Sequence, residues 1–185
     1  FFLVALLSSL TKTLGNPTIQ TADLSNPTGR QTNIPPAPPL AGPYATKHTT
    51  VTVPGLWAGE DTVDVYYATN ASSPQRFVSF AHGAWGGLFV LPFVYNSLLH
   101  SMASFGFVVA APRACLLGDC FDQYYKQQLV VIDWCKKEAA GGHPIMSLAD
   151  FVSNGVGVVG HSMGGQATLF SSEAGHAAQH GIAAA

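Results

Sequence analysis

The sequence predicts an α/β fold with a mostly parallel sheet and flanking helices. Three short apolar runs carry this prediction, namely "RFVSFAHG", "GFVVAAP" and "VGVVGHS". They lack the polar alternation of a half-exposed strand, so they are typical of strands that are covered on both faces. Helix-like segments separate and follow them. The order β, α, β, α, β, α favours parallel strands joined by right-handed crossovers.

Two further strands are expected before the first apolar run. In "KHTTVTVPG" and "DTVDVYYAT", valine alternates with threonine or other polar residues. This alternation is typical of half-exposed strands. We expect the two segments to form an antiparallel pair at one edge of the sheet.

The segments between the apolar runs have the spacing of helices. The first, "LPFVYNSLLHSMASFG", ends at Gly106, and the second, "FDQYYKQQLVVIDWCKKEAAGG", ends in two glycines. Glycine commonly ends a helix. We expect each helix to turn an apolar stripe toward the sheet, formed by Phe93, Val94, Leu98, Met102 and Phe105 in the first and by Tyr125, Leu129, Ile132 and Cys135 in the second.

Length and composition predict a globular domain without a nucleic-acid partner. The chain has 185 residues, of which 48% are hydrophobic and 10% charged, and its formal net charge is −2. Lysine and arginine occur singly rather than in patches, which argues against binding to nucleic acid. No apolar run approaches the ~20 residues that span a bilayer, so no stable membrane span is expected. The oligomeric state is not indicated.

The N-terminal residues are expected to lie outside the folded domain. Residues 1–15, "FFLVALLSSLTKTLG", have the length and character of a signal-peptide core, and we interpret them as a clipped secretory signal. A buried first element of the fold is the alternative. Residues 16–44 are rich in Pro, Thr and Asn and predict an extended leader. Residues 45–185 then form the domain, in a protein that is secreted or reaches a plastid through a secretory-type leader.

The three cysteines leave the redox state open. Cys115 and Cys120 lie in one loop-like segment and could form a disulfide in an oxidising compartment, with Cys135 unpaired. Equally, all three could be free and buried. The Cys-x4-Cys spacing lacks the second ligand pair of a zinc site, so no metal is expected. Asn70-Ala71-Ser72 fits the pattern of an N-glycosylation acceptor.

A candidate nucleophile lies in Gly160-His161-Ser162-Met163-Gly164, which fits the pattern Gly-x-Ser-x-Gly. The pattern follows an apolar strand-like run and precedes a helix-like one, which is the setting of a nucleophile elbow. So tight a turn forces the serine into a strained backbone region, and the two glycines provide clearance because they lack a Cβ. We therefore predict that Ser162 is a nucleophile. An ordinary glycine-rich turn with a solvated serine is the alternative.

A second glycine-rich loop, "HGAWGG", follows the first apolar run. The backbone N–H groups of such a loop can point at an oxyanion, so we predict Ala84 and Met163 as the two oxyanion donors. His82 and Gly83 belong to the loop. We expect His82 to hold the loop by hydrogen bonds rather than to act as a base, because a base must approach Ser162 from the opposite side.

Several motifs together resemble the α/β-hydrolase family. "FAHGAWGG", "ASFGFVVAAP" and "VGVVGHSMGGQAT" occur in its order, and they are similar to the branch that holds chlorophyllases and cutinase-like polyester hydrolases. "AGPYATKHTTV" and "VYYATNAS" resemble the cutinase-like members, whereas "YNSLLHSMASFGFVVAAP" is similar to the chlorophyllases. The resemblance covers most of Ala41 to Ala178. It implies a Ser-Asp-His carboxylic ester hydrolase that needs no metal or organic cofactor.

The substrate that this resemblance implies is a lipophilic small-molecule or polymeric ester. Trp85, Leu88 and Phe89 follow the oxyanion loop and are candidates for an apolar pocket, although such side chains also form protein cores. Acyl transferases and peptidases use the same serine turn, so both remain alternatives. A catalytically inactive binding protein that kept the fold is a further alternative.

The sequence departs from the family pattern after the serine. The acid and the histidine of the triad should follow the nucleophile, but only Glu173, His176 and His180 do so. We expect all three to lie on the helix that leaves the turn, where His176 is about 20 Å from the serine and beyond hydrogen-bonding reach. The other candidate acids, Asp119, Asp122, Asp133 and Asp150, precede the serine. We therefore expect an N-terminal portion of the domain, a fragment without the last strands that is inactive alone.

Overall fold

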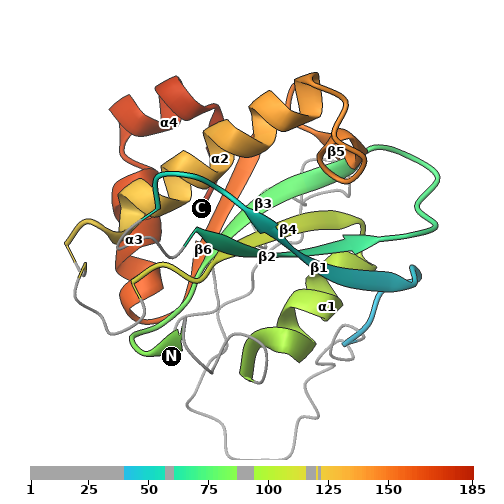
Figure 1. The fold of residues 1–185 in the computed structure, drawn as a ribbon, viewed down its shortest axis with the longest axis horizontal. Helices are drawn as coiled ribbons and strands as arrows, with labels where there is room; N and C mark the ends of the chain where they lie inside the picture. Colours follow the sequence, from blue (N-terminus) through green and yellow to red (C-terminus); the bar gives the residue numbers. More distant parts are fainter. Residues whose placement is uncertain (1–39, 57–60, 87–93, 116–119, 121) are drawn as a thin grey trace, which may run out of the picture.

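The computed structural model describes residues 40–56, 61–86, 94–115, 120 and 122–185 (Figure 1). Residues 1–15 and most of residues 16–44 therefore lie outside the described part, so the expected signal and leader are not described. The same holds for Leu88, Phe89, Phe93 and Asp119. Among the helices of the described part, none is both long and apolar enough to cross a membrane.

A mixed, mostly parallel sheet forms the centre of the fold (Figure 1). Its strands lie in the order β1-β2-β4-β3-β6-β7, and the short strand β5 also pairs with β3. β1 and β4 run antiparallel to β2, whereas β4, β3, β6 and β7 run parallel to one another. The bounds are β1 Thr46–Thr52, β2 Thr62–Ala68, β3 Gln75–Ala81, β4 Phe107–Pro112, β5 Ala149–Asp150, β6 Val156–Gly160 and β7 Ile182–Ala184. The predicted α/β fold is confirmed.

Helices cover both faces of this sheet (Figure 1). α1 (Asn96–Ser104) covers one face, and α2 (Tyr124–Ala140), α3 (Met163–Ser171) and α4 (Ala174–His180) lie on the other. The alternation of side chains along β2 reflects the two faces. Val65 packs in the cluster that contains residues of α2, and its neighbour Tyr66 packs in the cluster that contains Leu99 of α1. Both faces of β2 are therefore buried, although its alternation of valine with polar residues predicted a half-exposed strand.

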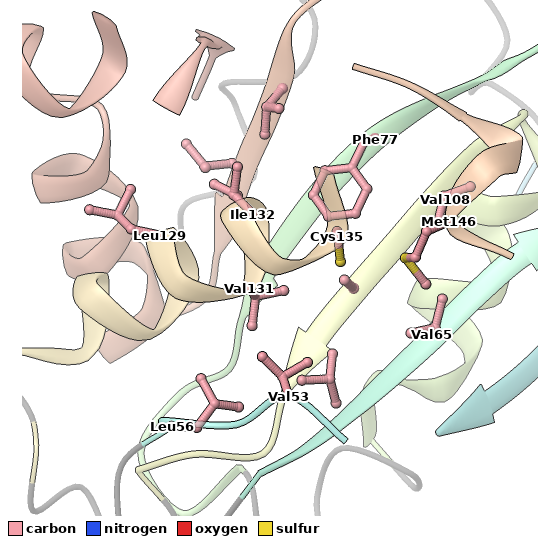
Figure 2. Close-up of a cluster of buried hydrophobic side chains, with 14 of the residues drawn as sticks. Val53, Leu56, Val65, Phe77, Val108, Leu129, Val131, Ile132, Cys135 and Met146 are labelled. Atoms are coloured by element: carbon pink, nitrogen blue, oxygen red, sulfur yellow. The ribbon is translucent and has the colours of Figure 1, made fainter. Parts of the chain in front are cut away.

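The larger core lies between α2 and the sheet (Figure 2). Leu129, Ile132 and Cys135 of α2 are buried there, as the helical spacing predicted. Tyr125 is only partly buried, whereas the adjacent Tyr124 is fully buried. This core is completed by Val53, which follows β1, and by strand residues that include Val63, Val65, Phe77, Val108 and Val158.

The predicted stripe on the first helix is correct in part, because Leu98 and Met102 are partly buried against the core on the α1 face. Leu99 and Ala103 of α1 are fully buried, whereas Val94 is 65% exposed and Phe105 is 44% exposed. The reason is that the α-helix begins only at Asn96, so Val94 lies before it and does not share its phase. Leu99 and Ala103 are four residues apart and therefore lie on the same face of the helix.

The segment after the serine forms two helices rather than one. α3 ends at Ser171, Glu173 caps the start of α4, and the chain then turns at Gly181, whose φ is 62°, into β7. The expectation that Glu173, His176 and His180 share one helix with the serine turn is therefore wrong. The break allows β7 to pair in parallel with β6. With β5, the described part of the sheet therefore has two strands more than the sequence predicted.

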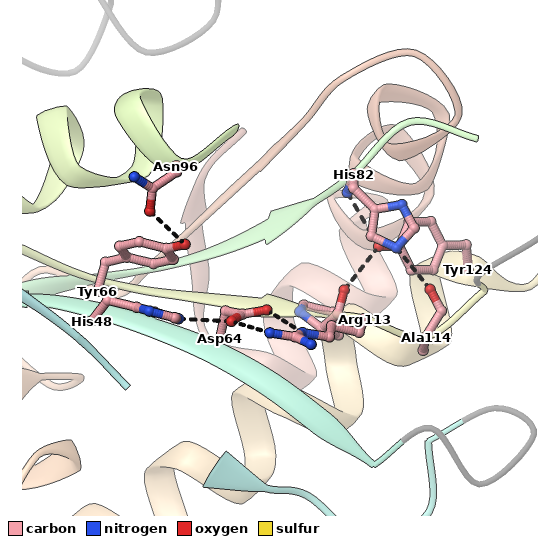
Figure 3. Close-up of polar contacts among 9 residues, drawn as sticks. His48, Asp64, Tyr66, His82, Asn96, Arg113, Ala114 and Tyr124 are labelled. Carbon is pink, nitrogen blue, oxygen red and sulfur yellow. Dashed lines mark hydrogen bonds and ion pairs between the residues drawn. The ribbon is translucent and has the colours of Figure 1, made fainter. Parts of the chain in front are cut away.

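A buried ion cluster fixes the other edge of the sheet (Figure 3). Asp64 of β2 is fully buried, and its carboxylate accepts two hydrogen bonds from Arg113, at 2.6 and 2.8 Å. The same carboxylate lies 2.7 Å from Nε2 of His48 on β1. The next residue but one, Tyr66, stacks on His48, and burial raises the pKa of its hydroxyl to about 12. A buried carboxylate needs such partners, so this cluster serves the fold.

Candidate active site

Ser162 lies in a strained turn between β6 and α3. Its φ is 54° and its ψ is −117°, a conformation that residues with a side chain rarely adopt. The residue is exposed, although the next two residues of α3, Met163 and Gly164, are buried. Ser162 also precedes the first turn of α3, where the helix dipole favours negative charge. The turn therefore presents a hydroxyl to solvent at the carboxyl edge of the parallel strands.

Two glycines make this turn sterically feasible. A Cβ on Gly160 would lie 2.0 Å from the carbonyl oxygen of Gly164, and a Cβ on Gly164 would lie 2.0 Å from the carbonyl oxygen of Ala81. No side chain fits at such distances. The ends of β6 and β3 and the start of α3 therefore approach one another more closely than any other residue would permit.

The loop after β3 lies beside the serine. Its first residues form a turn closed by a 2.9 Å hydrogen bond from the Gly86 N–H to the Gly83 carbonyl. A Cβ on Gly83 would lie only 3.4 Å from the Cβ of Ser162, so the two segments are in contact. Within the turn, Trp85 has a φ of 68° and remains 63% exposed. A bulky residue rarely occupies this backbone region.

Successive backbone N–H groups of this loop differ in whether they have a hydrogen-bond acceptor. The N–H of His82 donates to the hydroxyl of Tyr124 at 3.1 Å, and the N–H of Gly83 donates to the hydroxyl of Tyr95 at 3.1 Å. The N–H groups of Ala84 and Met163 have no acceptor among the residues that the structure describes. Since backbone donors are seldom left without a partner, these two amides are available to a ligand.

His82 is fully buried, and both nitrogens of its ring contact backbone carbonyls. Its Nδ1 lies 2.7 Å from the carbonyl oxygen of Gly83, and its Nε2 lies 2.8 Å from that of Ala114. Figure 3 shows the contact with Ala114. Burial lowers the pKa of His82, although both carbonyls act in the opposite direction. His82 therefore ties the loop to the chain that follows β4, and its ring does not reach solvent.

This environment predicts an acid-sensitive fold. Because the pKa of His82 is lower in the folded protein than its ordinary value of 6.5, the unfolded chain binds a proton first as the pH falls. The contribution of neutral His82 to the free energy of unfolding is therefore fully present above about pH 6.5. It falls as the pH is lowered toward the pKa of His82 in the folded protein, by at most about 1.4 kcal/mol per pH unit. Urea unfolding between pH 7.5 and 5 should show a weaker pH dependence for His82→Gln. Equal slopes for the two proteins would contradict this prediction.

A disulfide lies next to Met163, one of the two candidate oxyanion donors. Cys115 and Cys120 are bonded, and Cys135 is a free, buried cysteine. The sulfur of Cys115 lies 4.0 Å from the sulfur of Met163, in a small buried cluster with Tyr124 and Ala167. The disulfide therefore packs against the first turn of α3.

No acid–histidine pair reaches Ser162 within the described residues. His180 pairs with Asp133 at 2.8 Å, but the Gly181 carbonyl binds the N–H of Val156 at the opposite end of β6, about 16 Å away along the strand. The pair of His48 and Asp64 lies on the far side of β4, about three strand spacings, or ~14 Å, from β6.

Among the described residues, no hydrogen bond or ion pair joins the other candidate acids to Ser162. The carboxylate of Asp150 accepts hydrogen bonds from the backbone of Val152 and Ser153. Asp122 and Asp133 are exposed. Throughout the described part of the chain, no group of three or more His, Cys, Asp or Glu residues is arranged to hold a metal ion.

The sequence did not identify the two tyrosines that bind the loop. Tyr95 and Tyr124 are separated from their backbone partners by 12 and 42 residues along the chain. Tyr95 follows Val94 and Tyr124 precedes Tyr125 in helix-like segments, so the pattern gives no indication of a polar role. Only the fold brings their hydroxyls to the loop.

The sheet order, the strained serine and the two glycine-rich segments define the class of protein, an α/β-hydrolase. Comparison with protein-family models gives a match over residues 24–185 to the family PETase, described as PET hydrolase-like. The chain therefore belongs to this family of cutinase-like polyester hydrolases within the α/β-hydrolase superfamily. Comparison with curated proteins gives no significant match. Membership of the family implies an ester hydrolase in general terms.

Proposed function

We propose that the protein is a serine esterase that works through an acyl-enzyme. The hydroxyl oxygen of Ser162 attacks the ester carbonyl, the carbon–oxygen bond to the alcohol breaks, and water then releases the acid. The strained, exposed conformation of Ser162 is the observation that carries this proposal. Neither packing nor a binding role requires a serine at φ 54° in such a turn, and strain of this kind is concentrated at functional sites.

Two amides would stabilise the tetrahedral intermediate. The N–H groups of Ala84 and Met163 have no acceptor within the described residues, and their segments adjoin Ser162 from two sides. They would donate to the developing oxyanion, which is typically worth 10²- to 10³-fold in rate per donor. The hydroxyl attacks efficiently only with a general base, and in this proposal the base and its orienting acid come from outside the described residues.

The proposed substrate is a lipophilic ester, of polyester or cutin type or with a chlorophyllase-like phytyl group. Family membership supports an ester or polyester in general. The exposed indole of Trp85, two residues from Gly83, offers an apolar surface near the serine. Leu88 and Phe89 remain candidates for the same pocket, and they lie outside the described residues.

Hydrolysis of a matched substrate series tests this function. The purified gene product should hydrolyse p-nitrophenyl esters, with kcat/KM rising from acetate to longer acyl chains, and should leave the matching anilides intact. Soluble polyester oligomers and a chlorophyll ester, offered in parallel, distinguish the two substrate types. A protein that binds these esters without any turnover would instead support the inactive binding protein.

We also propose that the protein passes through the secretory pathway, which the disulfide and the apolar residues 1–15 support. Asn70 is exposed in the turn between β2 and β3, and its Oδ1 accepts a 3.0 Å hydrogen bond from the Ala45 N–H. Expression in eukaryotic cells from the gene's own start should yield a glycosylated product. Treatment with N-glycosidase should then shift its apparent mass on a gel downward. Asn70→Gln should remove that shift. A product that stays in the cytosol, unglycosylated and with free thiols, would contradict the proposal.

A further inference from the structure

We propose that Tyr95 is a positioning residue that joins the two halves of the oxyanion hole. Its hydroxyl accepts the N–H of Gly83 at 3.1 Å and lies 2.8 Å from Nδ1 of His161. Gly83 directly precedes Ala84, and His161 directly precedes Ser162. One side-chain oxygen therefore contacts both segments that carry the reacting groups. This inference rests on the proposed esterase function.

The hydrogen-bonding capacity of the hydroxyl fits this bridge. A phenol has one proton to donate and lone pairs to accept. Because Tyr95 accepts from the backbone of Gly83, its own proton can bond to Nδ1 of His161, whose proton then resides on Nε2. A single hydroxyl thus satisfies a backbone donor and a ring acceptor at once, and it links the loop to the turn beyond the point where β3 and β6 pair.

Packing of the Tyr95 ring fixes the position of its hydroxyl. Tyr95 is 8% exposed, directly precedes α1, and packs against Phe80 of β3 with 5.1 Å between ring centroids. Phe80 and Leu99 belong to the same buried cluster on the α1 face of the sheet. The bridge therefore connects α1 on one face of the sheet with the turn that leads to α3 on the other.

Gly83 is the residue that permits this contact. A Cβ there would lie 3.0 Å from Nδ1 of His161, 3.2 Å from the Tyr95 hydroxyl and 3.4 Å from the Cβ of Ser162. All three distances are at or below ordinary contact, so a side chain would force the groups apart. The glycine lets the hydroxyl, the imidazole and the serine converge on one point of the loop.

The bridge matters because an oxyanion hole acts through prepositioned donors. Its amides stabilise the transition state only when they already point at the position of the developing charge. The Tyr124 hydroxyl holds the N–H of His82 and the Tyr95 hydroxyl holds that of Gly83, so the next amide, that of Ala84, is oriented by its neighbours. Without Tyr95 the loop keeps the Tyr124 contact but loses its link to His161.

Tyr95→Phe tests the proposal because it removes the hydroxyl and keeps the ring. Esterase assays of the gene product should show kcat lowered about 10- to 100-fold, with KM changed less than about twofold. Affinity for an alkyl boronic acid, which forms a tetrahedral adduct with the serine, should fall by a similar factor. Tyr66→Phe is the matched control. It is also buried on the α1 face, but its hydroxyl bonds to Asn96 and not to the loop, so both readouts should stay unchanged.

A double-mutant cycle separates a bridge from general loosening. His161→Phe changes an exposed residue and removes the other end of the link. Tyr95→Phe introduced into the His161→Phe protein should lower kcat much less than Tyr95→Phe introduced into the wild type, because both changes break the same connection. Additive effects would overturn the proposal, as would a Tyr95→Phe protein with wild-type kcat and boronate affinity. If Tyr95→Phe does not fold, a His161→Phe protein with unchanged kcat would also overturn it. A wild-type protein without esterase activity would instead refute the proposed function.

Discussion

Ser162→Ala should abolish ester hydrolysis while leaving the fold intact. The change removes the only atom that the proposal assigns to bond formation, so kcat should fall by about 10⁴- to 10⁶-fold. Ser162 is exposed, and its hydroxyl caps no N–H group of α3. Alanine also carries a Cβ, as serine does, so the strain of the turn is unchanged. Thermal unfolding should therefore stay close to that of the wild type.

The control for this result is a serine on another surface. Ser147 is exposed, and its hydroxyl donates a hydrogen bond to the carbonyl of Ala139, at 3.3 Å. Ser147→Ala should retain full activity in the same assay. If Ser162→Ala hydrolysed esters at the wild-type rate, the serine would have no catalytic role and the esterase proposal would fail.

Gly164→Ala should destabilise the protein severely. A Cβ at this position would lie 2.0 Å from the Ala81 carbonyl oxygen and 2.6 Å from the His82 carbonyl oxygen, and both are backbone atoms that cannot rotate away. The start of α3 must then move off β3. We expect the free energy of unfolding to fall by about 4 kcal/mol or more, which is exceptional for one methyl group. Urea or thermal unfolding measures this directly.

A second glycine in a neighbouring helix provides the control. Gly175 lies in α4, and a Cβ there would meet no atom within 4 Å. Gly175→Ala should therefore leave stability unchanged or raise it by up to about 1 kcal/mol, because alanine loses less backbone freedom on folding. Similar losses for both substitutions would show that the close approach at Gly164 does not limit the fold.

Continuous apolar runs allowed the sheet to be predicted well. β3 and β4 are buried along almost their whole length and β6 is partly buried, so their sequences carry little polar alternation and differ from that of the largely exposed β1. β2 is buried on both faces in spite of its polar alternation, which the sequence pattern did not indicate. β7, with the sequence Ile-Ala-Ala, is too short and too similar to helix-forming segments to be recognised. Its pairing depends on the break between α3 and α4, which no local residue type indicates.

The candidate site was predictable to the extent that it depends on neighbours in the chain. A strand, a serine between glycines and a helix follow one another directly, so the strained turn at Ser162 could be anticipated. The bonds from Tyr95 and Tyr124 to the loop join residues that only the fold brings together. A pattern of apolar and polar residues carries no information on the position of a tyrosine hydroxyl in the folded protein.

The most direct test of the account is chemical labelling of the gene product with a fluorophosphonate, followed by peptide mass spectrometry. The account predicts one adduct per molecule, located on Ser162 and absent from Ser162→Ala. An enzyme that hydrolyses esters while Ser162 stays unmodified, or that carries the adduct on another residue, would contradict it.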